Sequence, residues 1–174
     1  MNGKTHTVLG VSTAVALCIT NPTLEIEGTV LTTVWSIPLA FLGSLLPDID
    51  LEQSTMGKKH RWIAKHLKHR GITHTLLVPA LIGLLIWFLL GKFSYAPDLL
   101  LGLEIGWVAH IVADMFNTPG VPLFWPIMRG RVHVANVQTS STKQQVVFII
   151  LWEVVLLAWI WLTYKGSIMT LLNI

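Results

Sequence analysis

The sequence is poor in charged residues and in cysteine. Asp, Glu, Lys and Arg make up 12% of its 174 residues, whereas an average soluble domain carries about 25%. Cys18 is the only cysteine, which excludes an intramolecular disulfide and a metal site built from several thiolates. Hydrophobic residues account for 53% of the chain, and the mean hydropathy is +0.65. Because so few charges could not cover a water-soluble fold, the composition indicates a membrane protein.

Five apolar segments approach the length of about 20 residues that a helix needs to cross a bilayer. They lie at about 6–20, 28–46, 74–91, 98–116 and 146–164, and turn-forming residues separate them. We therefore expect an all-α fold, a polytopic membrane helical bundle of about five transmembrane helices that forms a single domain over residues 1–174. A competing interpretation of the first segment is a secretory signal cleaved after Ala16.

The basic residues predict the orientation, because Lys and Arg favour cytoplasmic loops. If the N-terminus lies inside, ten of the twelve basic residues are cytoplasmic, and Lys92 and Lys165 are outside. The ten are Lys4, Lys58, Lys59, Arg61, Lys65, Lys68, Arg70, Arg129, Arg131 and Lys143. The sequence therefore predicts an N-in, C-out topology.

The most basic segment is the predicted cytoplasmic loop at residues 51–70. Its apolar residues Trp62, Ile63 and Leu67 alternate with Lys and Arg, a pattern typical of a helix that lies on a membrane surface. Such a segment would bind anionic lipid headgroups. The alternative is a loop that only determines the topology. We expect no nucleic-acid partner, because no nucleic-acid-binding module accompanies these charges.

His and Asp residues gather at the cytoplasmic ends of the predicted helices. Four segments carry them, although they are scattered over more than a hundred residues. Since the topology was derived from Lys and Arg alone, this shared level is independent evidence for a common site. The residues are His6, Asp48, Asp50, His69, His74, His110 and Asp114.

The fourth segment is the most informative. Gly102, Gly106, His110 and Asp114 follow one another at intervals of four and so share one face of a helix. The two glycines allow close approach of a neighbouring helix, so we expect His110 and Asp114 to point into the bundle. An imidazole and a carboxylate at this spacing can both reach one metal ion.

The residue types favour zinc. Imidazoles suit zinc and iron, whereas carboxylates also suit manganese, so Mn²⁺ or Fe²⁺ are the alternatives. One or two ions would activate a water as the nucleophile, with Asp48 and Asp114 taking part in that activation. Arg70 could clamp a phosphate or carboxylate of the substrate, or it could contact only the membrane surface. His60 and His66 lie in the basic loop, and we expect both to be solvated.

At these motifs the sequence resembles the YdjM-like family of bacterial inner-membrane proteins, described as metal-dependent hydrolases. The resemblance covers about residues 1–145 and implies location in the bacterial cytoplasmic (inner) membrane. It rests on His6 and on the stretches Leu45-Leu46-Pro47-Asp48-Ile49-Asp50, His69-Arg70-Gly71 with Thr73-His74, His110 with Ala113-Asp114, Thr118-Pro119-Gly120-Val121-Pro122-Leu123, and Trp125-Pro126.

A more distant likeness is to the zinc phospholipase C and P1 nuclease group, which has its ligands in a similar order. That resemblance implies that His110 and Asp114 hold one ion together with Asp48 or Asp50 and with His69 or His74. His6 and a bridging Asp114 would help to hold another. The chain departs from that group because it lacks the later His-x-x-x-Glu pair, so we expect one or two ions.

These observations lead to a functional hypothesis. We expect a membrane-bound metal-dependent hydrolase, similar to a phospholipase C or phosphodiesterase, that cleaves a phosphoester of a lipid or of another substrate near the membrane. One alternative is a non-catalytic membrane scaffold that a metal stabilises. The other is an ion- or proton-coupled transporter, which is less favoured because the polar residues gather at one face of the membrane.

Overall fold

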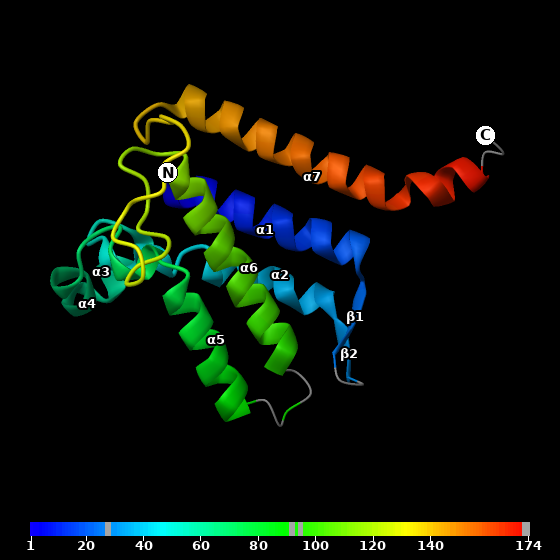
Figure 1. Ribbon diagram of the computed structural model, residues 1–174, viewed down its shortest axis with the longest axis horizontal. Coiled ribbons are helices and arrows are strands. Elements are labelled where there is room, and N and C mark those ends of the chain that lie inside the picture. The colour runs from blue at the N-terminus through cyan, green and yellow to red at the C-terminus, as the bar shows by residue number, and fades with distance from the viewer. Residues whose placement is uncertain (27–28, 91–92, 94–95, 172–174) are drawn as a thin grey trace.

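The computed structural model of the protein describes residues 1–26, 29–90, 93 and 96–171. Helices dominate it, as expected from the sequence. The longer ones are α1 (Gly3–Thr20), α5 (Leu77–Leu90), α6 (Ala96–Met115) and α7 (Thr142–Leu171), and α2 (Ser36–Gly43) is shorter. Helix α6 packs against α1, α2 and α5, whereas α7 packs against α1 (Figure 1).

Glycines bring α6 and α2 into close contact. A Cβ atom at Gly106 would overlap the backbone carbonyl of Ala40, and one at Gly43 would overlap the carbonyl of Leu103. The expected close approach of a helix to the Gly102–Gly106 face is therefore confirmed, and α2 is that helix. This contact matters for the site because His110 and Asp114 continue the same face of α6.

The segment at 28–46, expected to be one helix, has three parts. The first part is strand β2 (Thr29–Thr32), which pairs antiparallel with the preceding strand β1 (Thr23–Ile26). The 3₁₀ turn η1 (Thr33–Trp35) follows, and only then does α2 begin. The expectation of a continuous helix here is wrong. The run from Thr29 to Val34 is rich in β-branched residues, which favour strands.

One helix is long and apolar enough to cross a membrane by length and composition. It is the Thr142–Lys165 part of α7, with a mean hydropathy of 2.4. Helix α5 is apolar but has 14 residues, and α6 has 20 residues that include Asp98, Glu104 and Asp114. These values apply to the described residues.

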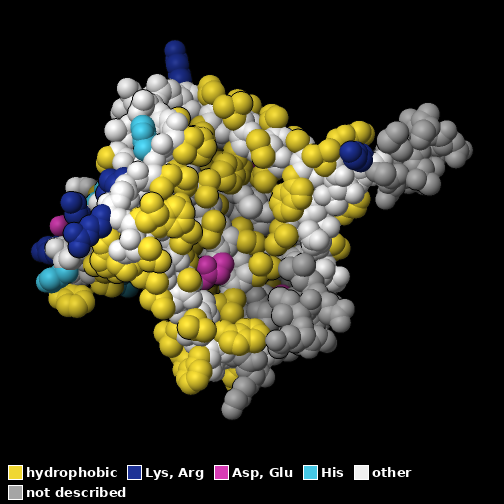
Figure 2. Space-filling model, in the orientation of Figure 1, with side chains coloured by type: hydrophobic (Ala, Val, Ile, Leu, Met, Phe, Trp, Pro, Cys, Tyr) yellow, Lys and Arg dark blue, Asp and Glu magenta, His cyan; other side chains and the backbone are white. Residues whose placement is uncertain are grey.

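The basic loop folds into two short helices, α3 (Thr55–Lys59) and α4 (Arg61–His66), which meet at His60. Trp62 on α4 is 75% exposed. Lys and Arg gather at the end of the molecule that holds α3 and α4, whereas hydrophobic side chains cover much of the helical body (Figure 2). The 3₁₀ turns η2 (Pro47–Asp50) and η3 (Ile72–His74) flank these two helices in the sequence.

Candidate metal centre

Five buried side chains form a closed ring where α1, η2, η3 and α6 meet. His6 comes from α1, Asp48 from η2, His74 from η3, and His110 and Asp114 from α6. The three histidines are fully buried, Asp114 is 1% exposed and Asp48 is 7% exposed. We call these five residues the His–Asp ring.

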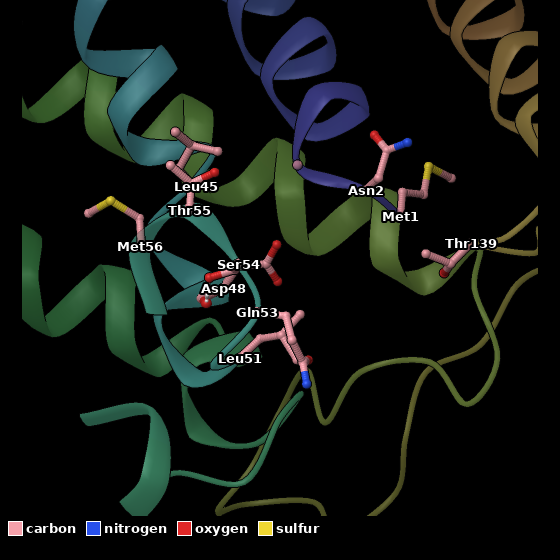
Figure 3. Close-up of a pocket in the computed structure, with 11 residues that line it drawn as sticks. Met1, Asn2, Leu45, Asp48, Leu51, Gln53, Ser54, Thr55, Met56 and Thr139 are labelled. Atoms are coloured by element: carbon pink, nitrogen blue, oxygen red, sulfur yellow. Dashed lines mark hydrogen bonds between the residues drawn. The ribbon is translucent and has the colours of Figure 1, made fainter. Parts of the chain in front are cut away.

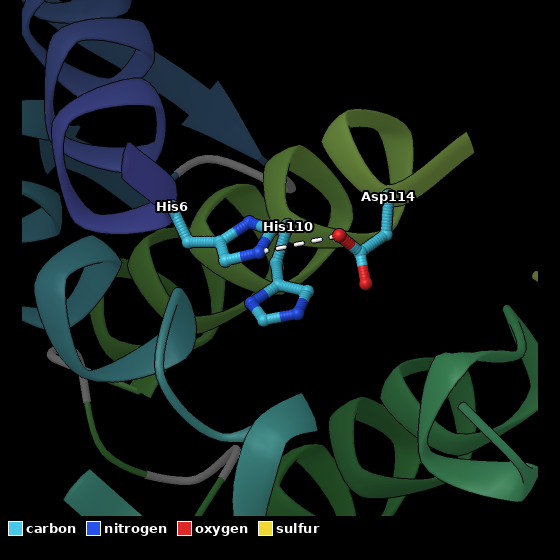
Figure 4. Close-up of side chains that lie close together, drawn as sticks. All are labelled: His6, His110 and Asp114. Carbon is cyan, nitrogen blue, oxygen red and sulfur yellow. Dashed lines mark ion pairs between the residues drawn. The ribbon is translucent and has the colours of Figure 1, made fainter. Parts of the chain in front are cut away.

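Carboxylates and imidazoles alternate around most of the ring. Asp114 lies between two histidines, with Oδ1 3.3 Å from His6 Nε2 and Oδ2 3.6 Å from His74 Nε2. Asp48 Oδ1 is 3.9 Å from His74 Nε2 and 3.5 Å from His110 Nε2. The imidazole rings of His110 and His6 stack with their centroids 3.5 Å apart, and this contact completes the His–Asp ring (Figure 4).

The orientation of His110 is set by a backbone carbonyl. Its Nδ1 lies 2.6 Å from the carbonyl oxygen of Ser44. A carbonyl can only accept a hydrogen bond, so Nδ1 carries the proton and Nε2 of the neutral ring has a free lone pair. That lone pair faces Asp48, and this arrangement is typical of histidines that bind metals.

His74 is oriented in the same way by side chains. The Thr73 hydroxyl donates to Asp50 Oδ2 at 2.5 Å, so its oxygen is free to accept from His74 Nδ1, which lies 3.0 Å away. Asp50 Oδ2 is also 3.3 Å from this Nδ1. His74 therefore presents Nε2, without a proton, to the ring.

Asp50 supports the ring from outside. It accepts a hydrogen bond from the Thr73 hydroxyl and another from the Arg70 backbone N–H at 3.0 Å. Its other oxygen lies 2.9 Å from His69 Nδ1. Burial by itself would raise the pKa of Asp50, but the bonds from His69, His74 and Thr73 outweigh it and hold the pKa well below its usual range. Asp50 is therefore an anion that fixes the segment carrying His74.

Two cationic groups adjoin Asp114. The Arg70 Nε lies 2.9 Å from Asp114 Oδ2, and its Nη1 donates to the carbonyl of Thr118 at 3.2 Å. The Met1 amino group lies 2.6 Å from Asp114 Oδ1. Arg70 has a φ of 54°, unusual for a residue with a side chain, and Arg131 donates to its carbonyl at 3.3 Å. These contacts hold the Arg70 guanidinium against the ring.

A cavity of about 290 Å³ reaches the ring at Asp48. The start of α1, the turn around Asp48 and the start of α3 enclose it, and Figure 3 shows Ser54 beside Asp48 and the two methionines, Met1 and Met56, on opposite sides. Asp48 is the member of the ring that lines this cavity. A small polar group that entered here would therefore meet Asp48 first.

The ring fits a metal ion. His6 Nε2, His74 Nε2 and His110 Nε2 are buried and find no hydrogen-bond partner among the described residues, a costly state for polar atoms. The possible ligand atoms of His6, His110 and Asp114 lie within 4.8 Å of one another, and so do those of Asp48, His74 and His110. Three imidazoles and two carboxylates without a thiolate suit zinc or a similar ion.

The structure brings together five of the seven sequence-predicted ligands in the ring. Asp50 and His69 lie at its edge, where they form a further possible group with Asp48. The His69 side chain is exposed. Of the histidines that we expected to be solvated, His60 is exposed, and so is His66, whose Nδ1 contacts the carbonyl of Trp62.

Sequence reasoning missed several groups that complete the site. Thr73 lies within the quoted motif and could have been identified from its place before His74. The carbonyl of Ser44 gives no signal, because every residue has a carbonyl. Arg131 had been counted only for topology, although it donates to the carbonyls of Arg70 and Gly120.

Comparisons with known proteins identify relatives of the chain. Inner membrane protein YdjM of Escherichia coli (strain K12) is 45% identical over 98 residues, which cover 52% of this chain and 48% of that protein. The Shigella flexneri protein of the same name gives the same values. The chain therefore spans about half the length of these two relatives. Uncharacterized protein YvsG of Bacillus subtilis (strain 168) is 29% identical over 157 residues, 84% of this chain and 87% of the relative.

No solved structure matches the chain. The family model described as YdjM inner membrane protein matches residues 1–173, a range that contains every residue of the His–Asp ring. Because this match covers nearly the whole sequence, the chain belongs to the YdjM family of inner membrane proteins.

Proposed function

We propose that this protein is a membrane-bound, metal-dependent hydrolase whose site lies on the cytoplasmic side of the inner membrane. The observation that carries the proposal is the His–Asp ring. In it, three imidazole nitrogens that have no hydrogen-bond partner among the described residues converge with two carboxylates. The cavity at Asp48 offers a route to the ring, and the Arg70 guanidinium lies against Asp114 of the ring.

The proposed topology has five membrane-spanning segments, with the N-terminus inside and the C-terminus outside. The distribution of ten basic residues against two supports it. The basic helices α3 and α4 lie at the same end of the bundle as the start of α1, while the β-hairpin and the end of α7 lie at the other (Figure 1). Both observations are consistent with site residues that lie at one depth, near the headgroups of the cytoplasmic leaflet.

His6, Asp48, His74, His110 and Asp114 would hold one or two ions, with Zn²⁺ favoured and Mn²⁺ or Fe²⁺ as alternatives. A divalent ion bound there would lower the pKa of a water and polarise a phosphoryl oxygen. His74 and His110 present their Nε2 atoms because Thr73 and Ser44 engage their Nδ1 atoms. The protein thus supplies a set of ligands that is already oriented.

In the proposed reaction, a phosphoester bond is hydrolysed at the mouth of the ring. The oxygen of water forms a new bond to phosphorus, and Asp48, which lines the cavity, accepts the proton at a carboxylate oxygen. The ester P–O bond breaks, and the leaving alcohol takes a proton from solvent. Arg70, whose guanidinium lies against Asp114, would bind a phosphoryl oxygen of the substrate.

A membrane lipid is the proposed substrate class. The site lies beside the basic helices α3 and α4, whose residues Lys58, Lys59, Arg61 and Lys65 are exposed. Basic residues near a membrane surface attract anionic headgroups. A substrate bound by its headgroup at this level would not have to leave the bilayer.

A metal-stabilised scaffold is the alternative. The complete burial of His6, His74 and His110 favours it, because a structural site is closed by protein ligands whereas a catalytic site keeps a position for water. Turnover separates the two functions. A scaffold would lose stability without its ion, but it would release no product in any condition.

The test begins with elemental analysis of protein purified without chelator. We expect at least about one ion for every two chains, and a loss of most of it in a His110→Ala, Asp114→Ala double variant. The matched control is a His60→Ala, His66→Ala variant, which also removes two histidines but lies outside the ring. Equal metal content in the wild type and the first double variant would contradict the proposed site.

The second measurement is product release from phosphatidylglycerol vesicles. Release that stops with chelator and returns with added Zn²⁺ would support the hydrolase. Metal-loaded wild type that turns over no phosphoester, ester or amide in a broad panel would contradict it. If that protein also melted much lower after metal removal, the scaffold would be the better account.

A further inference from the structure

An apolar groove runs along the outside of the bundle between α1 and α7. It has a volume of about 620 Å³, and Phe41 of α2 closes one side of it. Its wall on α1 includes Val8, Val11, Val15 and Ile19, which recur at intervals of three or four and so form one stripe along the helix. The described part of the chain leaves this stripe partly exposed, since Val8, Val15 and Ile19 are 42%, 37% and 46% exposed.

The groove adjoins the cavity at Asp48. Gly3 on α1 and Leu45 after α2 line the cavity, while Thr7 and Phe41 line the groove. Gly3 and Thr7 are four residues apart, which is one turn of α1. The two hollows therefore lie about one turn apart along the same pair of segments, and a single molecule could extend from one to the other.

The dimensions and charge of the groove suit one type of occupant. From Val8 to Ile19 the helix rises about 16 Å, roughly half of the 30 Å hydrocarbon core of a bilayer and thus the depth of one leaflet. Lys4, one turn before Val8 on the same stripe, is exposed. The groove is apolar, is as long as one leaflet is deep, and has the cation of Lys4 beyond its Val8 end. It is therefore complementary to an acyl chain that ends in an anionic headgroup.

We infer that the groove between α1 and α7 binds one acyl chain of an anionic phospholipid, and that the headgroup of the same lipid lies at the Asp48 cavity. The headgroup placement rests on the proposed function, whereas binding of the chain does not require hydrolysis. Glu153 of α7 also lines the groove, and its buried Oε1 has no hydrogen-bond partner in the described part of the chain. A second copy of the protein, which could offer a donor to this oxygen, is the competing occupant.

The test measures lipid retained by the purified full-length protein, using native mass spectrometry with added dioleoyl phosphatidylglycerol. Val11→Trp would fill the groove from α1 and Leu157→Trp would fill it from α7. Val155→Trp is the matched control, because Val155 lies on α7, is 67% exposed and does not line the groove. Metal content and melting temperature report the fold, and Leu157→Trp decides the result if Val11→Trp fails to fold.

We expect one lipid per chain in the wild type and in Val155→Trp. Retention should fall about tenfold or more in the groove variants, the loss expected when about two methylenes stay unburied. Lys4→Gln should reduce the preference for phosphatidylglycerol over phosphatidylcholine with the same chains. Lipid loss in the groove variants would support the assignment even if the wild type hydrolyses nothing, and in that case only the hydrolase proposal would fail.

Equal retention in all three tryptophan variants would overturn the inference. It would also be overturned if the wild type retained no lipid but formed a dimer that Val11→Trp abolished, because the groove would then belong to a second copy of the chain.

Discussion

Two of the three ring histidines are held through one nitrogen and present the other. Ser44 engages Nδ1 of His110, and Thr73 engages Nδ1 of His74. His6 differs, because neither of its nitrogens has a hydrogen-bond partner among the described residues and it is positioned by stacking on His110. A change in one of the supporting groups should therefore alter metal affinity without removing any ligand.

Thr73→Val tests this support. Valine has nearly the same shape but cannot accept the hydrogen bond from His74 Nδ1 or donate to Asp50. We expect metal affinity to fall about 10- to 100-fold, the range for loss of such outer partners, as measured by competition with a chelating dye. Thr75→Val is the control, because Thr75 is also buried and, among the described residues, its hydroxyl bonds only the carbonyl of Ile72. Equal losses in both variants would contradict the role of Thr73.

Asp114→Asn tests the carboxylate between His6 and His74. Asparagine keeps the size of the side chain but removes the negative charge that would bind the ion. Hydrolysis of phosphatidylglycerol should fall about a hundredfold or more, while the protein still inserts and folds. Glu104→Gln removes the same charge from the same helix outside the ring and should retain activity. Wild-type turnover in Asp114→Asn would show that this carboxylate is not a ligand.

All five residues of the ring were among the seven ligands predicted from the sequence, but the internal order of the ring could not be predicted. Spacing on one helix face placed His110 with Asp114, and the shared membrane level placed His6, Asp48 and His74 near them. Which nitrogen faces which oxygen depends on the path of η2 and η3, where the chain is not a regular helix. Sequence alone therefore left Asp48 and Asp50 as alternative ligands, whereas the structure places Asp48 in the ring and Asp50 behind His74.

At the scale of the elements, the packing of α2 on α6 controls the distance across the ring. The close contact at Gly106 brings Ser44, just after α2, within reach of His110 one turn further along α6. Asp48 follows in η2. The glycine contact therefore aligns α6, which carries His110 and Asp114, with the segment after α2, which carries Asp48.

Gly106→Ala should move these elements apart. Its Cβ would overlap the Ala40 carbonyl, and overpacking of this kind costs about 1–3 kcal/mol. For a chain of this size, the melting temperature should then fall by roughly 2–4 °C per kcal/mol. Gly130→Ala, where a Cβ meets no atom within 4 Å, should melt like the wild type. An unchanged melting temperature in Gly106→Ala would contradict the tight contact.

The glycine spacing predicted this contact correctly, but the apolar run at 28–46 was misleading as a single helix. Hydrophobicity indicates where a chain can be buried, and it does not distinguish a strand from a helix over a short run. The β-branched residues from Thr29 to Val34 provided the stronger local signal.

At the scale of the whole molecule, charge and apolar surface are segregated along the bundle, and the proposed topology places the basic end in the cytoplasm. Cysteine labelling in a Cys18→Ser background checks this topology. Thr23→Cys, in the exposed first residue of β1, should react with an impermeant maleimide in spheroplasts with an intact inner membrane. Lys59→Cys and Ser140→Cys, both exposed, should react only after permeabilisation. Labelling of Lys59→Cys from outside would overturn the cytoplasmic placement of the site.

Metal removal should lower the stability of the whole protein. An ion present at a hundred times its dissociation constant stabilises the folded state by about 2.7 kcal/mol, which corresponds to roughly 5–10 °C in melting temperature for a chain of this size. The His110→Ala, Asp114→Ala variant should melt at the same temperature with and without chelator. A similar drop in that variant would place the stabilising ion elsewhere.

The ring also has a consequence for biosynthesis. Its side chains extend from His6 to Asp114, and a nascent chain emerges with its N-terminus first. In the proposed topology, His6, Asp48 and His74 are therefore inserted before the pair on α6, and polar groups without partners at the membrane are costly. Arrival of α6 is the step that assembles the ligands, whereas α7 contributes none of them. We expect metal loading to mark the insertion of α6 and to precede that of the last helix.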